Sequence, residues 1–576
     1  MSSSSQLGRR SFVGLGGAVL GAVAASPFGA ATAFGAPREV HVRDFGARPD
    51  DDTDDTEAIR AAIAAASATG RPTVVRFDAG TYRLRPDTER GASLPITGAA
   101  GLTLAGRTTP DGAPATRLLS AIPLANDLAP ATQFQLIDCH GLTLRDLILD
   151  YAPRATTSGE IVAVDAAADL VTVDVFEGSA HFDGMRCYSA NSWDLATGQL
   201  NHVAPLTIGA NPDQFSNVWH SVPGGAGRRY TITGFGFSDR VRPGDGASWH
   251  FNVVGGSYNV YALGCRDLRL ENLLINNAIG AGILAGYGHN LTCRDVTYAP
   301  AGPDLAVGPR DAIHLSNNTG LLDYQGGRLA GVRWDPLVSR SSFVRVAAIE
   351  SARKLTIEPT SAGSRPLPFS PGDELTFWSG PLPSTVRIAA VTPADEAGSA
   401  FLIMLDADLP GTVAVGSLVT SSGHEWDQAR ISATTFEGNI GTALVFMNKN
   451  LVVEHCRFAN NAYHDIGFGT TSGPTGSFAR NVIVRDNVFA GSGWVRKYAK
   501  FASNGAITTL ANNGAFTTQP YNSAIMIENN RFSDLTEAGV YLRNARDVTV
   551  RGNSYHRVTR RVVVDEASTE QITVAD

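Results

Sequence analysis

The sequence predicts an all-β chain that coils into a right-handed parallel β-helix and carries two inserted small β-barrel or β-sandwich domains. Short strands of alternating apolar and polar residues recur, and each ends on a residue that we call its closing position. Steps of 22 or 23 residues separate the closing positions 272 and 295, 434 and 456, and 530 and 553. Two long intervals interrupt this recurrence. The chain has 576 residues, is 43% hydrophobic and contains 60 glycines, which suits a large core with many turns.

The recurring segments place apolar side chains at every second position, as in Asp267–Asn272, Asn290–Asp295 and Asp547–Asn553. One such coil has no partner for its inward face, so coils must stack, with neighbouring backbones about 4.8 Å apart. The stacked coils then share one core of Val, Ile and Leu. Asn530, at a closing position, is interpreted as part of an asparagine stack.

The two interruptions predict inserted domains, because compact proteins rarely contain such long structureless loops. Both intervals hold strands of their own, including Leu170–Val175 and Phe401–Leu405. The predicted organisation is a signal peptide over 1–36, an N-terminal cap and first coils over 37–154, inserted domains over 155–250 and 340–422, central coils over 251–339 and C-terminal coils over 423–576.

The N-terminus has the pattern of a twin-arginine export signal. Arg9-Arg10 is followed by Phe12 and an apolar run to Ala25, and Ala31-Thr32-Ala33 fits a cleavage site. We therefore expect a secreted protein. No later segment has 18 uninterrupted apolar residues, so no membrane span is expected. The net charge of -8 and the lack of a basic stripe argue against nucleic-acid binding.

Five cysteines without paired spacing argue against a disulfide scaffold and a zinc site. They favour buried free thiols, with one disulfide as the alternative. Cys139 and Cys265 open similar segments and are expected to stack. No cofactor motif is visible, so no cofactor and no metal are predicted. The acidic run Asp50–Asp55 precedes an Ala-rich helix. It is interpreted as helix capping, with a calcium site as the alternative.

Carbohydrate chemistry on a β-helix face needs carboxylates about one coil apart. Asp311 and Asp335 are 24 residues apart and are predicted to project from neighbouring coils into one pocket. Carboxyl groups roughly 6.5–9.5 Å apart suit inversion at the anomeric carbon, and roughly 5–5.5 Å suits retention. The alternative for any single Asp here is turn capping or a hydrogen bond between coils.

Other polar and aromatic residues in the same region are candidates for substrate contacts. Trp334 is either a sugar-stacking platform or a buried aromatic. His314 either orients a substrate hydroxyl or is structural. The remaining candidates are Arg310, Arg333, Asp304, Glu425 and His464, with Asp465 beside His464 on a later coil.

The segments Val42–Ala47 and Asp50–Ile59 resemble the N-terminal cap of the pectate-lyase-like, right-handed parallel β-helix superfamily. Residues 140–490 are similar to glycoside hydrolase family 110, the exo-acting α-1,3-galactosidases. The matching segments are Asp146–Tyr151, Gly159–Asp165, Ala278–Leu284, Asp311–His314, Asn448–Glu454 and Val482–Phe489.

This resemblance implies a parallel β-helix with added β-barrels and inversion at the anomeric carbon. The family's catalytic carboxylates lie in an Asp segment before a His and in a vicinal Asp pair about one coil later. Asp311 matches the first, and Asp335 matches the second Asp of the pair. Trp334 stands where the pair's first Asp is expected, and an indole cannot protonate a leaving oxygen. Asp465 is therefore the predicted acid, with Asp304 or Glu425 as alternatives.

The leading hypothesis is a secreted exo-acting glycoside hydrolase that cleaves an α-linked galactoside or related sugar from an oligosaccharide or polysaccharide. Asp311 and Asp335 would activate water, and Asp465 would donate the proton. The second hypothesis is a polysaccharide lyase or epimerase, in which Arg310 and Arg333 neutralise a substrate carboxylate. The third is a non-catalytic glycan-binding protein, motivated by Trp334. The sequence makes no prediction of the oligomeric state.

Overall fold

The computed structural model describes residues 37–576 except 188, 203–217, 234–237, 252–253, 361–366, 397, 470–474, 496–503 and 512–517. The predicted export signal at residues 1–36 lies outside this part. Arg38–Asp576 form one compact unit. Within the described chain, no helix combines the length and the apolar character needed to cross a bilayer.

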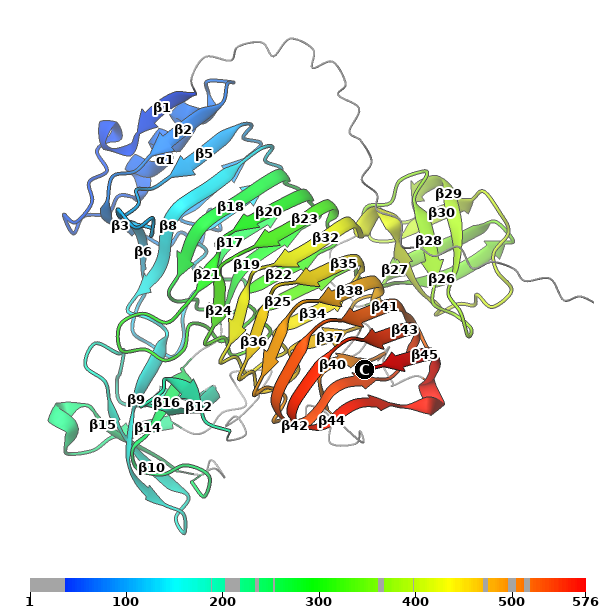
Figure 1. The fold of residues 1–576 in the computed structure, drawn as a ribbon. Helices are drawn as coiled ribbons and strands as arrows, with labels where there is room; N and C mark the ends of the chain where they lie inside the picture. Colours follow the sequence, from blue (N-terminus) through cyan, green and yellow to red (C-terminus); the bar gives the residue numbers. More distant parts are fainter. Residues whose placement is uncertain are drawn as a thin grey trace, which may run out of the picture. The chain divides into compact units, whose positions relative to one another are not determined.

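The unit is built from three ladders of parallel strands, here called A, B and C, which the chain visits in turn on each coil (Figure 1). Ladder A contains β1 (Arg38–His41), β2 (Thr73–Arg76), β5 (Leu102–Ala105), the first parts of β8 (Thr143–Ala152) and β18 (Arg266–Ile275), β20 (His289–Arg294), β23 (Thr319–Gln325), β32 (Trp426–Ser432), β35 (Lys449–Glu454), β38 (Arg480–Arg485), β41 (Asn522–Glu528), β43 (Ala545–Arg551) and β45 (Thr569–Ala575).

Ladder B contains β3 (Gly80–Leu84), β6 (Thr116–Ala121), the second parts of β8 and β18, β21 (Thr297–Tyr298), β24 (Arg328–Ala330), β33 (Thr435–Glu437), β36 (Arg457–Ala459), β39 (Val488–Ala490), and the first parts of β42 (Arg531–Leu542) and β44 (Ser554–Val564). Ladder C contains β4 (Leu94–Thr97), β7 (Phe134–Ile137), β17 (Tyr258–Leu263), β19 (Ala281–Gly286), β22 (Ile313–Ser316), β25 (Leu337–Arg340), β34 (Leu444–Met447), β37 (Ile466–Phe468), β40 (Gly505–Thr509) and the second parts of β42 and β44.

Two units of antiparallel strands interrupt the coils. Between β8 and β17, an eight-stranded sheet is formed by β9 (Thr156–Asp165), β10 (Leu170–Val175), β11 (Met185–Arg186), β12 (Ser189–Asp194), β13 (Gln199–Leu200), β14 (Val218–Ser221), β15 (Arg229–Thr233) and β16 (Asp245–His250). Between β25 and β32, a closed barrel is formed by β26 (Val344–Ser351), β27 (Lys354–Pro359), β28 (Glu374–Phe377), β29 (Ser384–Pro393), β30 (Phe401–Leu405) and β31 (Leu418–Ser421). The predicted fold class, a parallel β-helix with inserted β units, is confirmed.

The inward faces of the ladders form one continuous core. In ladder B the rings of Phe436, Phe458, Phe489 and Phe532 stack with centroid distances of 4.8, 4.9 and 4.8 Å, because consecutive coils keep the same register. All five cysteines are buried and free, as predicted. Such stacking gives each coil the partner for its inward face that it lacks alone.

Buried asparagines satisfy the backbone at the corner between ladders A and B. Asn487 Nδ2 donates to Asn530 Oδ1 at 3.0 Å, and Asn530 Nδ2 donates to Asn553 Oδ1 at 3.0 Å. The predicted asparagine stack at Asn530 is therefore present. The asparagine side chains supply hydrogen-bond partners for backbone N–H and C=O groups at the corner, which do not take part in the strand ladders.

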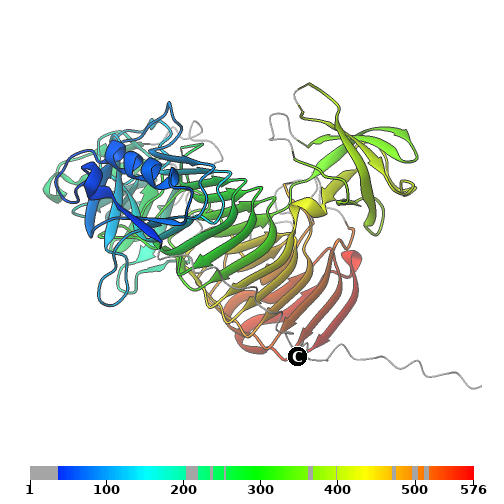
Figure 2. The ribbon, with the colours of Figure 1, turned by 90° about the horizontal axis from the view of Figure 1, so that it is seen from above.

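Helix α1 (Thr56–Ser67) covers the N-terminal end of the coils (Figure 2). Ile59, Ile63 and Ala66 on its apolar face enter the common core. Four 3-10 turns complete the described helices: η1 (Val42–Phe45), η3 (Gly225–Gly227), η4 (Ser422–His424) and η5 (Glu566–Ser568).

The acidic run before α1 only partly follows the capping interpretation. Asp54 Oδ1 accepts a hydrogen bond from the Thr56 backbone N–H at 3.0 Å, at the start of the helix. Asp55 holds the N-cap position, but its side chain makes no cap bond. Its carboxylate instead accepts the backbone N–H groups of Arg48 and Arg83, at 2.9 and 3.0 Å. Its role is to fasten this loop to β3.

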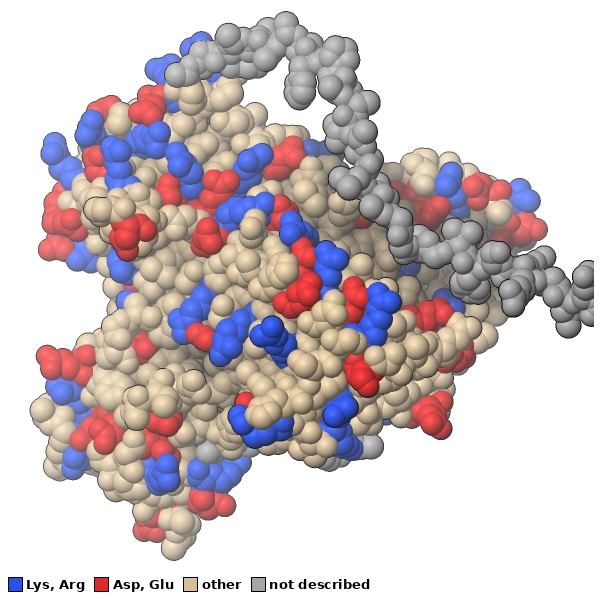
Figure 3. Space-filling model, viewed as in Figure 1, with Lys and Arg blue, Asp and Glu red and all other residues tan. Residues whose placement is uncertain are grey.

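The outer face of ladder A carries charges of both signs that pair across coils (Figure 3). Arg294 pairs with Asp323, and the Glu454 carboxylate lies between Arg430 and Arg485 at 2.6 and 2.7 Å. These pairs leave no large region of one sign on this face. The Glu454 carboxylate is buried, but its arginine partners and the Arg294–Asp323 pair are partly exposed, and partly exposed pairs of this kind add little stability.

Candidate active site

Most of the predicted site residues lie in the turns that join ladder B to ladder C. These B–C turns, at 299–312, 331–336, 438–443 and 460–465, stack along the coil axis. The candidates brought to them are Asp304, Arg310, Asp311, Arg333, Trp334, Asp335, His464 and Asp465. Glu425 is not among them.

Asp311 and Asp335 occupy matching positions on adjacent coils. Ile313 of β22 pairs with Leu337 of β25, and each Asp lies two residues before its paired residue. Adjacent coils are about 4.8 Å apart. The structure thus brings the two carboxylates to neighbouring coils, as their spacing in the sequence indicated.

Asp311 is fixed by His314, which stands on the outer face of β22. His314 Nδ1 donates to Asp311 Oδ2 at 2.6 Å, and the Asp311 residue is 7% exposed. Asp311 Oδ1 and His314 Nε2 are buried and have no hydrogen-bond partner in the described chain. The pair therefore keeps one carboxylate oxygen and one ring nitrogen for another group.

Asp335 is oriented by the backbone of the next coil. Its Oδ1 accepts the Thr442 backbone N–H at 2.7 Å, and the residue is 8% exposed. The neighbouring Gly441 lets this turn come close: a Cβ there would lie 2.2 Å from the Trp334 carbonyl oxygen and 2.7 Å from the Asp335 nitrogen. Any larger side chain must push these backbone atoms away.

We expect Gly441→Ala to lower the free energy of unfolding by about 1–3 kcal/mol, because the added methyl group meets backbone atoms rather than a flexible side chain. The displacement also moves Asp335, so turnover falls as well. Urea unfolding and initial rates measure the two effects. Gly411→Ala is the control, since its Cβ would meet nothing within 4 Å. Equal stability of the two variants would contradict this account.

Trp334 lies between two guanidinium groups. The Cζ atoms of Arg310 and Arg333 are 5.7 and 6.0 Å from its ring centroid, so both make cation–π contacts. Arg333 is 2% exposed and lies toward the first inserted unit. Burial, assisted by the charge of Arg333, lowers the pKa of His250 on β16 to about 3. Trp334 lies in a turn and is half-buried, so it is not the fully buried aromatic that was one of its two interpretations.

A groove of about 360 Å³ runs over the outer face of ladder C, beside the start of the barrel. Its lining includes Tyr258 and Tyr261, whose rings stack at 5.0 Å, and Ser316 and Arg340. The charge of Asp311 acts on the pKa values of both Tyr258 and Arg340, which places its carboxylate near the groove. The sequence analysis missed these lining residues. These residues could have been found as the outward-facing positions of the strands that form ladder C.

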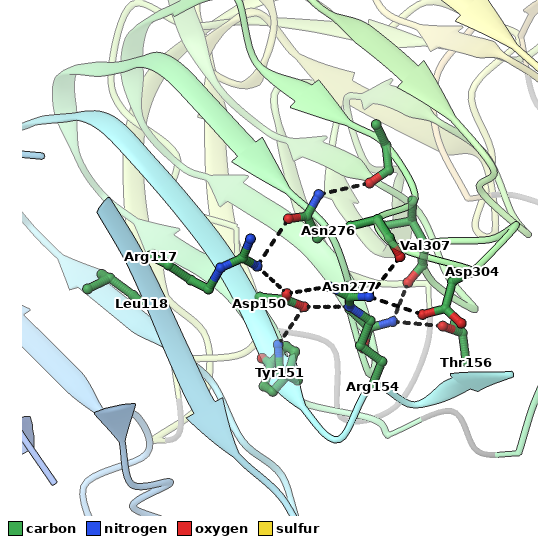
Figure 4. A network of polar contacts seen from close by, with 12 residues as sticks. Arg117, Leu118, Asp150, Tyr151, Arg154, Thr156, Asn276, Asn277, Asp304 and Val307 are labelled. Atoms are coloured by element: carbon green, nitrogen blue, oxygen red, sulfur yellow. Dashed lines mark hydrogen bonds and ion pairs between the residues drawn. The ribbon is translucent and has the colours of Figure 1, made fainter. Parts of the chain in front are cut away.

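Asp304 belongs to an ion network with Arg154 and Asp150 (Figure 4). Arg154 lies between two carboxylates: its Nη2 donates to Asp150 at 2.9 Å and its Nη1 to Asp304 at 3.3 Å. Ser179 of the first inserted unit donates to the other Asp304 oxygen. Burial raises the pKa of Asp304, and these partners oppose that rise. Asp304 thus fastens the turn that carries Asp311.

Asp465 and His464 lie three coils beyond Asp311, and both are buried. Asp465 is 0% exposed, and its Oδ1 accepts Asn461 Nδ2 at 2.8 Å. His464 Nδ1 lies 3.1 Å from both the Gly505 carbonyl oxygen and the Thr508 hydroxyl. A proton donor must reach the leaving oxygen. The structure places Asp465 out of such reach, because burial separates it from solvent and from the groove lining.

Burial raises the pKa of Asp465 from 3.8 to about 7. The folded protein therefore holds a proton that the unfolded chain releases between these values. The contribution of Asp465 to stability is fully present below about pH 4 and is lost as the pH rises to about 7. The loss is up to about 4 kcal/mol. We expect Asp465→Asn to flatten this decline in urea unfolding measured between pH 5 and pH 8. Parallel pH dependence in both proteins would contradict the assignment.

Glu425 lies at the corner between ladders C and A, where the chain returns from the barrel. Its buried carboxylate pairs with Arg480 and, at 3.1 Å, with Lys449. The structure therefore does not bring it to the B–C turns. The barrel insertion moves it to another corner, which linear spacing does not reveal.

Comparisons with known proteins bear on this fold and site. The family described as rhamnogalacturonase A/epimerase, pectate lyase-like, matches residues 39–135. Among characterised proteins, the chain is 23% identical over 515 residues to alpha-1,3-galactosidase A of Streptomyces avermitilis, covering 79% of this chain and 78% of that protein. The resemblance inferred from the motifs is thereby confirmed.

Solved structures that match the chain share little sequence with it. The mannuronan C-5 epimerase AlgE4 A-module of Azotobacter vinelandii is 15% identical, with 93% of this chain and 100% of that chain covered and a TM-score of 0.41. The family 28 exopolygalacturonase of Yersinia enterocolitica is 12% identical, with 93% and 78% covered and a TM-score of 0.31.

Proposed function

We propose that this protein is a carbohydrate-active enzyme, and within that class a secreted, exo-acting glycoside hydrolase for an α-linked galactoside or a related sugar. The observation that carries the proposal is the placement of Asp311 and Asp335 at matching positions of adjacent coils. The groove lined by the stacked Tyr258 and Tyr261 lies near Asp311, whose charge acts on the pKa values of Tyr258 and Arg340. The alpha-1,3-galactosidase relative supports the substrate class.

In the proposed reaction the two carboxylates divide the work of acid and base. One protonates the glycosidic oxygen, and the other activates the attacking water. His314 fixes Asp311, and the Thr442 backbone N–H fixes Asp335, so neither carboxylate must reorganise during the reaction. The stacked Tyr258 and Tyr261 offer a flat apolar surface for a sugar ring. Inversion at the anomeric carbon is proposed from the resemblance to family 110.

The test is a hydrolysis screen of the purified mature protein. Nitrophenyl α- and β-glycosides and natural galactose-, arabinose- and fucose-containing oligosaccharides are incubated with it, and released sugars are separated by chromatography. Release of a single monosaccharide supports exo-hydrolysis, and NMR of the nascent anomer then decides inversion or retention. Unsaturated, ultraviolet-absorbing products from uronate polymers would instead establish a lyase. Sugar binding without turnover would establish a binding protein.

A further inference from the structure

The groove over ladder C contains one charged side chain among its described lining residues, and it is a cation. The lining consists of Arg340 together with neutral side chains: Tyr258, Tyr261, Leu263, Leu284, Gly286, Tyr287, Ser316, Asn317, Ser342, Phe343, Val344, Pro359, Thr360, Leu367 and Thr475. A neutral sugar requires no such charge. The cation therefore indicates something about the ligand.

Arg340 stands at the end of β25 and is partly buried. In register it lies between Ser316 of β22 and Met447 of β34. Its Nε donates to Ser316 Oγ at 3.1 Å, and its Nη1 donates to the Thr475 carbonyl oxygen at 3.3 Å. Both acceptors are neutral, so they orient the guanidinium without neutralising it.

Two other partly buried arginines of this protein, Arg154 and Arg480, have carboxylate partners. Arg154 pairs with Asp150 and Asp304, and Arg480 pairs with Glu425. No ion pair to Arg340 is present in the described chain, although the charge of Asp311 reaches it at longer range. An unpaired cation in a partly dry site is unfavourable, so its retention there points to an anionic partner that arrives with the ligand.

We propose that the groove binds a glycan with an anionic substituent, a carboxylate or a sulfate ester, and that the oriented guanidinium of Arg340 binds this group. The inference rests on the proposed function in one respect: the groove is taken as the substrate groove. Arg340 fixes the acidic group through charge-assisted hydrogen bonds, and the tyrosine platform contacts the ring. The repulsive Asp311 carboxylate keeps the anion at the Arg340 end.

Binding of free sugars to the wild-type protein tests this without turnover. Isothermal titration calorimetry compares galactose, galacturonate and galactose 6-sulfate at low and high ionic strength. We expect at least one acidic sugar to bind about ten- to a hundredfold more tightly than galactose, with the difference shrinking as salt rises. Preference for galacturonate alone identifies a uronate, and preference for the sulfated sugar alone identifies a sulfate ester.

Substitutions test whether Arg340 is the source of the preference for acidic sugars. Arg340→Met is expected to abolish it, and Arg340→Lys to keep part of it, because the lysine retains the charge but loses the planar fork. Arg345→Met is the matched control: Arg345 is an exposed barrel residue paired with Glu358 at 2.7 Å, and its loss leaves the preference unchanged. Thermal melts report whether each variant folds, and the lysine variant and the salt series test the proposal if the methionine variant does not.

Equal affinity for galactose and both acidic sugars, or an unchanged preference in a folded Arg340→Met protein, overturns the inference. Hydrolysis of neutral glycosides without acidic preference overturns it and leaves the proposed hydrolase standing. Tight binding of acidic sugars with no hydrolysis of any substrate supports the anionic ligand and overturns the proposed hydrolase.

Discussion

Replacing Asp311 with Asn is expected to lower kcat/KM by about 10²–10⁴-fold, the range found when a positioned acid or base is removed. Asn has the same shape but can neither take up nor deliver a proton at neutral pH. The partnership with His314 also changes, because an amide oxygen replaces the charged acceptor at 2.6 Å. Initial rates on the substrate found in the hydrolysis screen measure the effect.

Asp335→Asn is expected to lower the rate by a similar factor. Its amide oxygen still accepts the Thr442 N–H, so the turn keeps its conformation while the charge is lost. Asp427→Asn is the control, since this exposed carboxylate lies on ladder A, away from the B–C turns. Thermal melts must show folded proteins throughout. Wild-type rates in both folded variants would exclude these two residues as the catalytic pair.

Asp150→Ala is expected to lower the free energy of unfolding by about 3 kcal/mol. Asp150 is 2% exposed and accepts hydrogen bonds from Arg117, from Arg154 Nε and Nη2 at 3.1 and 2.9 Å, and from the Tyr151 N–H at 2.9 Å. Without this carboxylate, the described chain offers Arg117 only Asn276 Oδ1 at 3.3 Å, and it offers Arg154 Asp304 and a backbone carbonyl.

Urea unfolding at pH 7 measures this loss. Asp408→Ala is the matched control, because its pair with Arg353 is exposed on the barrel and is worth less than about 1 kcal/mol. A loss of less than 1 kcal/mol in both variants would show that the network in Figure 4 does not hold the first inserted unit to the coils.

Local patterning made the fold predictable. Alternating apolar residues, as in Asp547–Asn553, specify the inward and outward faces of a strand, and closing polar residues such as Asn530 specify the corner. The 24-residue step from Asp311 to Asp335 equals one coil without an insertion, so their adjacency could be inferred as well.

The rest of the site depends on turn length and insertion, which periodicity does not encode. Asp465 precedes a ladder C strand, as Asp311 does, yet it is fully buried and its carboxylate accepts a hydrogen bond from Asn461. Glu425 follows the barrel and emerges at a different corner. Arg340 looked like an ordinary strand end, and its importance arises only because the chain places Thr475 and the start of the barrel around it.

The two inserted units leave the coil on either side of ladder C, one from the B–C corner and the other from the C–A corner. The barrel contributes Val344, Pro359 and Leu367 to the groove lining beside the ladder C strands, so part of that lining lies on segments that do not set strand register. Those segments can be lengthened, shortened or exchanged while the hydrogen-bonded coils keep their alignment. New ligand preferences can therefore evolve, or be engineered, without redesign of the core.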